Sequence, residues 1–301
     1  MRTIGAGYKV WRWAILGLVV AGALTGSAGF AQQGGQAIPI SAKAENDRGV
    51  ELALVLGPGR SLKDARKCFE RGAREGYAPA QVNLAVMNVY GLGMPQNYGA
   101  ALYWLKSAAE SRNPQAYTNL GILYLKGWGV QQNYAEARKY FELAADAGDT
   151  GAMVNLGYLA DGGLGSAVDH TAAAEYYRHA AERGDALGQN NLADLYLRGE
   201  GVAQSDAQAF AWFEKAAEQG NTGARIKLGF MYANGRATKR DEEMAYAYIL
   251  AASIAGDSRG VEYVRAIGAK LSTEQLESAT KRAKAMQVAP VIPREEMAFV
   301  K

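Results

Sequence analysis

The stretch Ala116–Gly151, AYTNLGILYLKGWGVQQNYAEARKYFELAADAGDTG, recurs along the chain with a period of 36 residues and decides the fold. Five repeats follow one another in register, beginning at Ala80, Ala116, Ala152, Gly188 and Ala224. Their columns align without a gap, as in Leu84, Leu120, Leu156, Leu192 and Leu228. A period of this size is typical of a solenoid, in which each repeat is too small to bury its own apolar face and stacks on its neighbours.

Each repeat is predicted to form two helices joined by a short turn. Leu120 and Tyr124 lie one turn apart on an apolar face, and Gly127 ends this first helix because glycine readily adopts a positive φ. Asn133 stands where a second helix would begin, and its side-chain oxygen can accept a hydrogen bond from a backbone N–H of the first turn. The other repeats also have N-cap residues in that column, namely Asn97, Asp169, Ser205 and Asp241. The second helix then carries an apolar stripe, formed by Ala137, Tyr140, Phe141, Ala144 and Ala145.

Three further patterns concern helix starts and turns. Asn133 with Glu136, Ser205 with Gln208, and Ser272 with Gln275 have the spacing of a reciprocal capping box. The third repeat has Ser166-Ala167-Val168 where others have a Gly-Val turn, and the fifth has Ala237-Thr238 in that turn. These departures indicate a local change of curvature or specialised loops, or else neutral drift at a solvent-facing turn.

The N-terminal segment is predicted to be an export signal. Arg2, Lys9 and Arg12 precede the apolar run 14–24, and small residues follow, with a cleavage site expected after Ala31 or Ala28. The run is shorter than the roughly 20 apolar residues that span a bilayer. We therefore expect a bacterial periplasmic or secreted protein with no stable membrane span after cleavage; the alternative is an uncleaved anchor in the inner membrane.

Charge and cysteine content exclude two classes of protein. Of the 33 basic and 30 acidic residues, three basic ones lie in residues 1–31, which leaves 30 of each and a formally neutral mature chain. A nucleic-acid partner is not expected, because such binding needs a concentrated positive surface. Cys68 is the only cysteine, so no internal disulfide can form. It occupies the column of Trp104, which favours a buried apolar residue over an intermolecular bridge or a reactive thiol.

The repeat signature resembles the Sel-one-like repeat (SLR) family, a relative of the tetratricopeptide repeat. In the second repeat the matching residues are Ala116, Asn119, Leu120, Gly121, Tyr124, Gly127, Gly129, Val130, Ala137, Tyr140, Ala144, Ala145 and Gly148. The resemblance implies an all-α, right-handed solenoid that serves as an adaptor for other proteins, often at bacterial envelopes. Some members have been proposed to act on β-lactams or cell-wall material, but those are cysteine-rich and this chain is not.

The expected layout follows from the repeats and this resemblance. It is a signal peptide at 1–31, a linker at 32–43, a degenerate opening repeat at 44–79, repeats at 80–115, 116–151, 152–187, 188–223 and 224–259, closing helices at 260–286 and a mobile tail at 287–301.

No catalytic, cofactor-binding or metal-binding residue is predicted. His170 and His179 are nine residues apart on one expected helix, roughly 13 Å of rise, which is too far for one metal ion. The Gly-x-Gly turns lack the following Lys-Ser or Lys-Thr of a phosphate-binding loop. The asparagine column Asn83, Asn119, Asn155 and Asn191 either binds an extended peptide or ties one repeat to the next.

A partner is predicted to bind the inner, concave surface, which the resemblance assigns to the first helix of each pair. This surface reads as an apolar strip followed by a polar patch and fits an amphipathic helix or extended peptide. The candidate residues are Val82, Val86, Val89, Tyr90, Ile122, Leu125, Tyr158, Asn190, Asp194, Arg198 and Phe230. Alternatively, tight winding buries the strip.

The sequence therefore favours a non-enzymatic scaffold for a protein or peptide of the cell envelope, one that regulates its partner by occupancy. Two rival functions stay open: an enzyme acting on cell-wall or β-lactam-type substrates, and a purely structural spacer.

Overall fold

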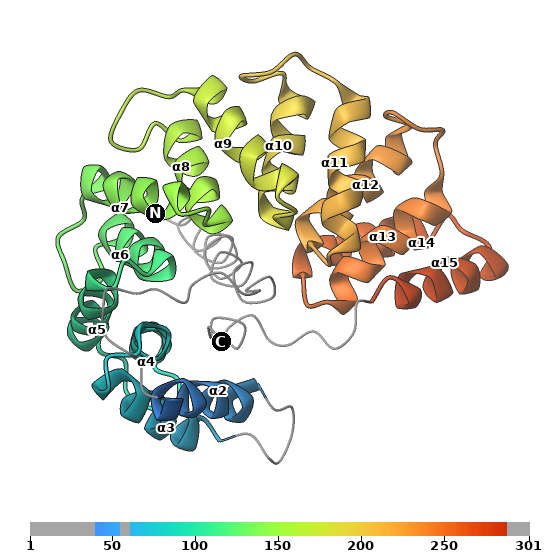
Figure 1. Ribbon diagram of the computed structural model, residues 1–301. Helices are drawn as coiled ribbons and strands as arrows, with labels where there is room; N and C mark the ends of the chain where they lie inside the picture. The colour runs from blue at the N-terminus through green and yellow to red at the C-terminus, as the bar shows by residue number, and fades with distance from the viewer. Residues whose placement is uncertain (1–39, 55–60, 288–301) are drawn as a thin grey trace, which may run out of the picture. The chain divides into compact units, whose positions relative to one another are not determined.

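The computed structural model describes residues 40–54 and 61–287, and these residues form helices and turns with no strand among them (Figure 1). The predicted all-α solenoid of paired helices is confirmed. The helices are α2 (Ile40–Leu54), α3 (Leu62–Arg74), α4 (Ala78–Tyr90), α5 (Tyr98–Glu110), α6 (Pro114–Lys126), α7 (Tyr134–Asp146), α8 (Thr150–Asp161), α9 (His170–Glu182), α10 (Ala186–Arg198), α11 (Asp206–Glu218), α12 (Thr222–Asn234), α13 (Glu242–Ile254), the 3-10 helix η1 (Ser258–Gly260), α14 (Val261–Gly268) and α15 (Thr273–Ala285).

The chain divides into two compact units, which we treat separately. Unit 1 comprises the described residues up to Ala167, and unit 2 those from Val168 to Gln287. The border lies in the third repeat, within the Ser166-Ala167-Val168 turn that departs from the Gly-Val pattern. This departure therefore marks a structural boundary of the array.

Helix starts follow the predicted N-cap column. Asn97, Asn133, Asp169, Ser205 and Asp241 each accept a hydrogen bond from the first turn of their helix. The reciprocal capping box forms at Ser272 with Gln275. At Asn133 and Ser205 we find only the bond to the cap side chain, so the box predicted there from spacing alone is incomplete.

Helix ends show where the third repeat differs. Gly91, Gly127, Gly199 and Gly235 end their helices in the left-handed region, with φ between 65° and 69°. In the third repeat α8 ends one residue earlier, and its cap Gly162 is right-handed with φ of −88°. The turn that follows Asp161 therefore takes a different path from the turns of the other repeats.

A second repeated contact ties several helical pairs to the pair before them. A side chain in the first helix donates to the backbone carbonyl eight residues earlier, at the end of the preceding second helix. These bonds run from Gln81 to Ala73, Tyr117 to Ala109, Gln189 to Ala181 and Arg225 to Ala217. Met153 stands in this column in the third repeat and has no N–H or O–H group to donate.

The first helix corrects the expected linker. Residues 40–43 belong to α2 rather than to a linker, because Ala42 and Asn46 are buried one turn apart on the same face of this helix. The signal peptide, the rest of the linker and residues 288–301 lie outside the described residues. Cys68 is buried as predicted, and burial raises the pKa of its thiol, which disfavours the reactive thiolate.

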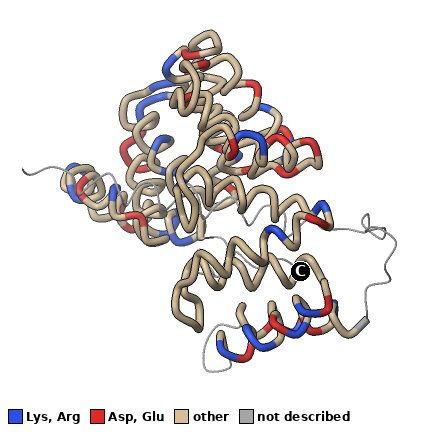
Figure 2. Tube along the Cα trace, turned by 90° about the vertical axis from the view of Figure 1, so that its left-hand side faces the viewer, with Lys and Arg blue, Asp and Glu red and all other residues tan. Residues whose placement is uncertain are grey.

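Charge is unevenly spread within unit 1. Helix α4 has no charged residue and α6 has one, whereas α3 carries charges along much of its length. Figure 2 shows this as red and blue segments near the bottom of the view, below helices that are nearly all tan. Among the described residues no helix is long and apolar enough to cross a membrane.

Candidate functional site

In unit 1 the predicted inner strip is packed into the protein. Val82, Val86 and Val89 belong to a core cluster with residues of α5 and α6, and Tyr90 packs against this cluster. Ile122 and Leu125 are also buried. The apolar surface of these side chains therefore already contacts other atoms of the chain. A binding role for these six residues stays a prediction.

Tyr158 lies on α8 at the end of unit 1 and is half-buried. Burial raises the pKa of its phenol to about 12, with a smaller contribution from Tyr134. The hydroxyl therefore stays protonated at neutral pH and can donate a hydrogen bond.

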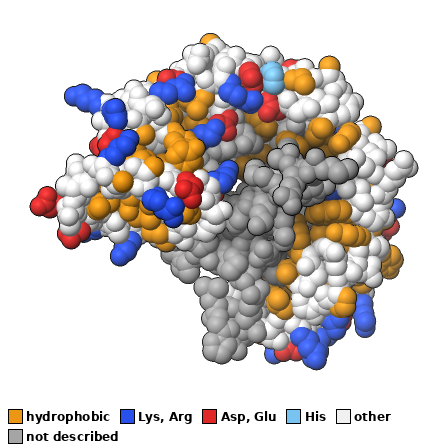
Figure 3. Space-filling view, turned by 180° about the vertical axis from the view of Figure 1, so that it is seen from behind, with side chains coloured by type: hydrophobic (Ala, Val, Ile, Leu, Met, Phe, Trp, Pro, Cys, Tyr) orange, Lys and Arg blue, Asp and Glu red, His pale blue; other side chains and the backbone are white. Residues whose placement is uncertain are grey.

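Unit 2 presents a different inner face. Asp194 on α10 and Phe230 on α12 are both partly exposed. The side chains around them come from α10, from α12 and from the segment that follows α13. We call this surface the unit 2 inner face; it consists of Asn190, Asp194, Lys227, Phe230, Arg259 and Tyr263. Figure 3, seen from behind, shows charged and hydrophobic side chains intermixed over unit 2 at the left of the view.

Two ion pairs organise its polar part. Lys227 Nζ lies 2.8 Å from Asp194 Oδ1 and joins α12 to α10. Arg259 donates from Nε and Nη2 to the two carboxylate oxygens of Asp257, at 2.9 and 2.5 Å. The cationic side chains remain 43% and 51% exposed, respectively. Both pairs are therefore accessible from solvent.

The arginine also changes the ionisation of its neighbours. Burial alone would raise the pKa of Asp257, but hydrogen bonds from Arg259 and Thr222 and the guanidinium charge lower it below the ordinary value of an aspartate. The pKa of Arg259 is raised by its bond to Asp257 and, more weakly, by the charge of Asp194. Arg259 is thus influenced by two carboxylates and links the α10 part of the surface to the turn after α13.

Asn190 and Arg259 both lie beside Gly223 on α12. A Cβ placed on Gly223 would lie 3.4 Å from Asn190 Oδ1 and 3.8 Å from Arg259 Nη2. Asn190 donates to Asn191 Oδ1 at 3.1 Å, while its own Oδ1 is buried and has no hydrogen-bond partner in the structure.

Aromatic rings form the apolar part. Phe230 and Tyr263 pack edge to face, with ring centroids 4.6 Å apart and an interplanar angle of 77°. Tyr263 is 48% exposed although it is a large apolar side chain. Such a ring pair can accept an aliphatic or aromatic side chain from a partner.

Of the residues predicted for the polar patch, the structure brings Asn190 and Asp194 together on the unit 2 inner face and places Arg198 elsewhere. Asn190 and Asp194 lie close to the turn between α13 and α14, whereas Arg198 pairs with Glu200 at 2.6 Å beyond the end of α10. Sequence reasoning missed Lys227, Arg259 and Tyr263. The available signal was the asparagine column, in which Lys227 replaces asparagine and Tyr263 follows 36 residues later.

Two asparagines of this column donate hydrogen bonds within the protein. Asn83 donates to the buried Asn46 at 2.9 Å and ties α4 to α2, and Asn119 donates to the Gln115 carbonyl within α6. The interpretation that this column ties repeats together is confirmed at Asn83. At Asn119 the bond stays within one helix.

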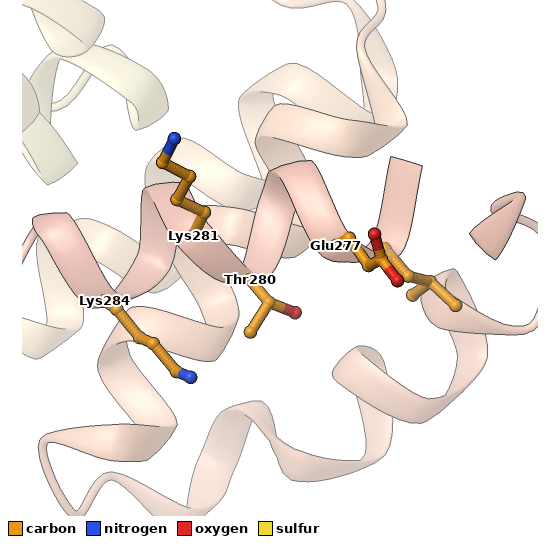
Figure 4. A pocket seen from close by; sticks show the side chains of 5 residues that line it. Glu277, Thr280, Lys281 and Lys284 are labelled. Atoms are coloured by element: carbon orange, nitrogen blue, oxygen red, sulfur yellow. The ribbon is translucent and has the colours of Figure 1, made fainter. Parts of the chain in front are cut away.

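Two shallow hollows lie elsewhere in unit 2. One, of about 450 Å³, runs along α15 beside Leu276, Glu277, Thr280, Lys281 and Lys284. In Figure 4 Lys281 points to one side of the helix and Thr280 and Lys284 to the other, so these groups do not converge. The other hollow has Glu242 between Arg240 and Lys270, at 2.5 and 4.0 Å. Its principal carboxylate is therefore already paired.

The paired helices and the recurring contact between pairs define an α-solenoid of helical repeats. The chain belongs to the Sel1 repeat family: the Sel1 repeat model matches residues 52–77, 78–113, 114–149, 150–185, 186–221 and 223–257. Five of these matches begin within two residues of the first residue of α4, α6, α8, α10 or α12. The repeats defined from the sequence begin two residues after the first residue of the same helices. No curated protein matches the chain.

Solved structures agree with this family. A Sel1 repeat protein from Oxalobacter formigenes is 31% identical, with 69% of this chain and 83% of that one covered and a TM-score of 0.63. An immunity protein from Pseudomonas aeruginosa, PA5088, is 18% identical over 86% of this chain and 91% of that one, with a TM-score of 0.51, and shows likeness of fold alone. Sel1 repeats generally mediate protein–protein interactions, and their solenoids are typically non-catalytic scaffolds.

Proposed function

We propose that this protein is an exported scaffold that binds another protein or peptide of the bacterial cell envelope through the unit 2 inner face. The observation that carries the proposal is the Phe230–Tyr263 ring pair, partly exposed at Phe230 and 48% exposed at Tyr263, beside the half-exposed cations Lys227 and Arg259. Apolar rings beside charged groups are typical of binding surfaces, because the rings supply contact area and the charges fix orientation. Export is proposed from the N-terminal sequence.

The inner strip of unit 1 is not the main contact surface in this proposal. Val86 is 1% exposed and packs in the core cluster, so a partner would reach it only after local rearrangement. We therefore place the main contact on unit 2 and assign the valines of unit 1 to packing.

Photo-crosslinking in cells that export the protein tests the proposal. In one variant a photoreactive phenylalanine derivative replaces Tyr263. In the matched control variant it replaces Tyr103, which is 65% exposed and lies on α5, the second helix of its pair. One discrete adduct with another protein from position 263, absent from position 103, is expected. Adducts at neither position would contradict a binding role for this face and would favour a structural spacer. Equal labelling at both would indicate non-specific contact.

A further inference from the structure

The exposed charge of the unit 2 inner face is mostly positive, although its two ion pairs are formally neutral. In one pair the side chain of Asp257 is 10% exposed and that of its partner Arg259 is 51% exposed. In the other pair the side chain of Asp194 is 29% exposed and that of its partner Lys227 is 43% exposed. A molecule that approaches this face therefore meets the cations before the carboxylates.

Both cations also keep hydrogen-bond donors that the described residues do not use. Lys227 has three ammonium hydrogens and one ion pair. Arg259 uses Nε and Nη2 for its ion pair, while its Nη1 donates no bond among the described residues. On α14 Glu262 and Arg265 pair with each other at 3.7 Å and add no net charge beside Tyr263. A further carboxylate would thus find charged donors here without displacing either aspartate.

The cations and the rings follow one side of α12. Lys227 and Phe230 are three residues apart, so they are neighbours on the helix surface, with Cβ atoms about 5–6 Å apart. Gly223, beside which Arg259 lies, precedes Lys227 by about one turn. Tyr263 packs on Phe230. The surface therefore runs from two cations to two rings along about two turns of one helix.

An extended peptide can meet both parts of this surface with three residues. In an extended chain, side chains two positions apart point the same way and lie about 6.5–7 Å from one another. A carboxylate followed two positions later by an aromatic side chain therefore matches the step from Lys227 to Phe230. Adjacent residues of an extended chain point to opposite sides, so they would not match it.

We propose that the unit 2 inner face binds extended segments of partner proteins in which an acidic residue is followed two positions later by an aromatic one. The carboxylate binds Lys227 and Arg259, and the aromatic ring packs against Phe230 and Tyr263. Charge-assisted hydrogen bonds fix the register of the segment, and the rings supply contact area. The inference rests on the proposed function of this face and names the chemistry of the partner.

Short synthetic peptides test this chemistry on the purified full chain. The probe is Gly-Ser-Glu-Ser-Phe-Ser-Gly, capped at both ends so that the glutamate carries its only charge, with a photoreactive derivative in place of the phenylalanine. Irradiation is expected to give an adduct that mass spectrometry maps to residues 227–230 or 259–263. Glutamine in place of the glutamate is expected to raise the half-saturating peptide concentration about fivefold or more, as loss of charge-assisted bonds predicts. Moving the glutamate next to the aromatic residue should weaken binding to a similar degree.

Variants of the protein locate the carboxylate contact. When Lys227→Gln and Arg259→Gln are combined, the glutamate and glutamine peptides should bind equally weakly. The control Lys215→Gln removes an exposed cation of α11 and should keep the difference of about fivefold. Circular dichroism checks that each variant is folded.

Three outcomes would overturn the proposal. The first is equal binding of the two peptides to the unchanged protein, and the second is an adduct on other surfaces or no adduct at all. The third is loss of the preference for glutamate in Lys215→Gln as well, because the preference would then reflect the charge of the whole protein. Failure here is distinguishable from failure of the proposed function, since the adduct from position 263 with another protein in cells would persist if that partner used different chemistry.

Discussion

One column of the repeat faces inward in both units but meets different surroundings. In unit 1 it holds Val86, which is buried in a cluster with α5 and α6. In unit 2 it holds Asp194 and Phe230, which are partly exposed and meet a lysine and a tyrosine from neighbouring helices. Repeat position therefore fixes the direction of a side chain, but the neighbours decide whether it becomes core or surface. A binding face is best sought where this column departs from aliphatic residues.

The largest expected loss of stability comes from placing the same charge in the same column of both units. Val86→Asp is expected to destabilise the protein by about 3–5 kcal/mol, because it buries a carboxylate without a partner. Phe230→Asp in the same column should cost about 1–2 kcal/mol, since its site is partly exposed. Urea unfolding followed by circular dichroism measures both. Equal losses would show that the two inner faces are alike in burial.

A neighbouring column gives a second matched pair. Asn83→Ala is expected to cost about 1–3 kcal/mol, because it removes a hydrogen bond to the buried Asn46. Lys227→Ala removes only a half-exposed ion pair and should cost less than about 1 kcal/mol. Comparable losses in urea unfolding would contradict the assignment of this column to packing in unit 1 and to surface in unit 2.

The repeats themselves were predictable because they depend on local sequence. Periodic columns gave the helical pairs, and the side chains in the Asn133 column gave five correct helix starts. The contacts between repeats were not predictable in this way. Asp194 and Lys227 are 33 residues apart, whereas residues of the same column are 36 apart. A comparison within columns therefore does not pair these two residues. The border between the units likewise falls within one irregular turn, at Ala167 and Val168.

Acid pH is expected to weaken the unit 2 surface. The pKa of Asp257 is lowered in the folded state, so its ion pair stabilises folding above about pH 4 and loses this effect as pH falls through the lower folded value. Arg259→Gln removes the charge that lowers this pKa and should shift the acid unfolding midpoint to higher pH. The loss at pH 7 should be about 0.5–1 kcal/mol, because Arg259 is half-exposed.

Titration from pH 6 to pH 2 with circular dichroism measures the shift, and Lys215→Gln serves as a control cation in the same unit. An unchanged midpoint in Arg259→Gln would show that the turn after α13 contributes nothing to acid stability.

The smallest effect concerns a turn that differs between the units. Gly129 and Ala237 share a column and both have a positive φ, at 72° and 58°. Left-handed backbone costs an L residue such as alanine about 1–2 kcal/mol, whereas glycine adopts it freely but loses about 0.5–1 kcal/mol more conformational entropy on folding. Ala237→Gly should therefore stabilise the protein by about 0.5 kcal/mol, which raises Tm by roughly 1–2 °C in a chain of this size. A lower Tm would mean that the neighbouring Arg236–Asp206 ion pair, whose nitrogen and oxygen lie 2.5 Å apart, depends on the alanine backbone.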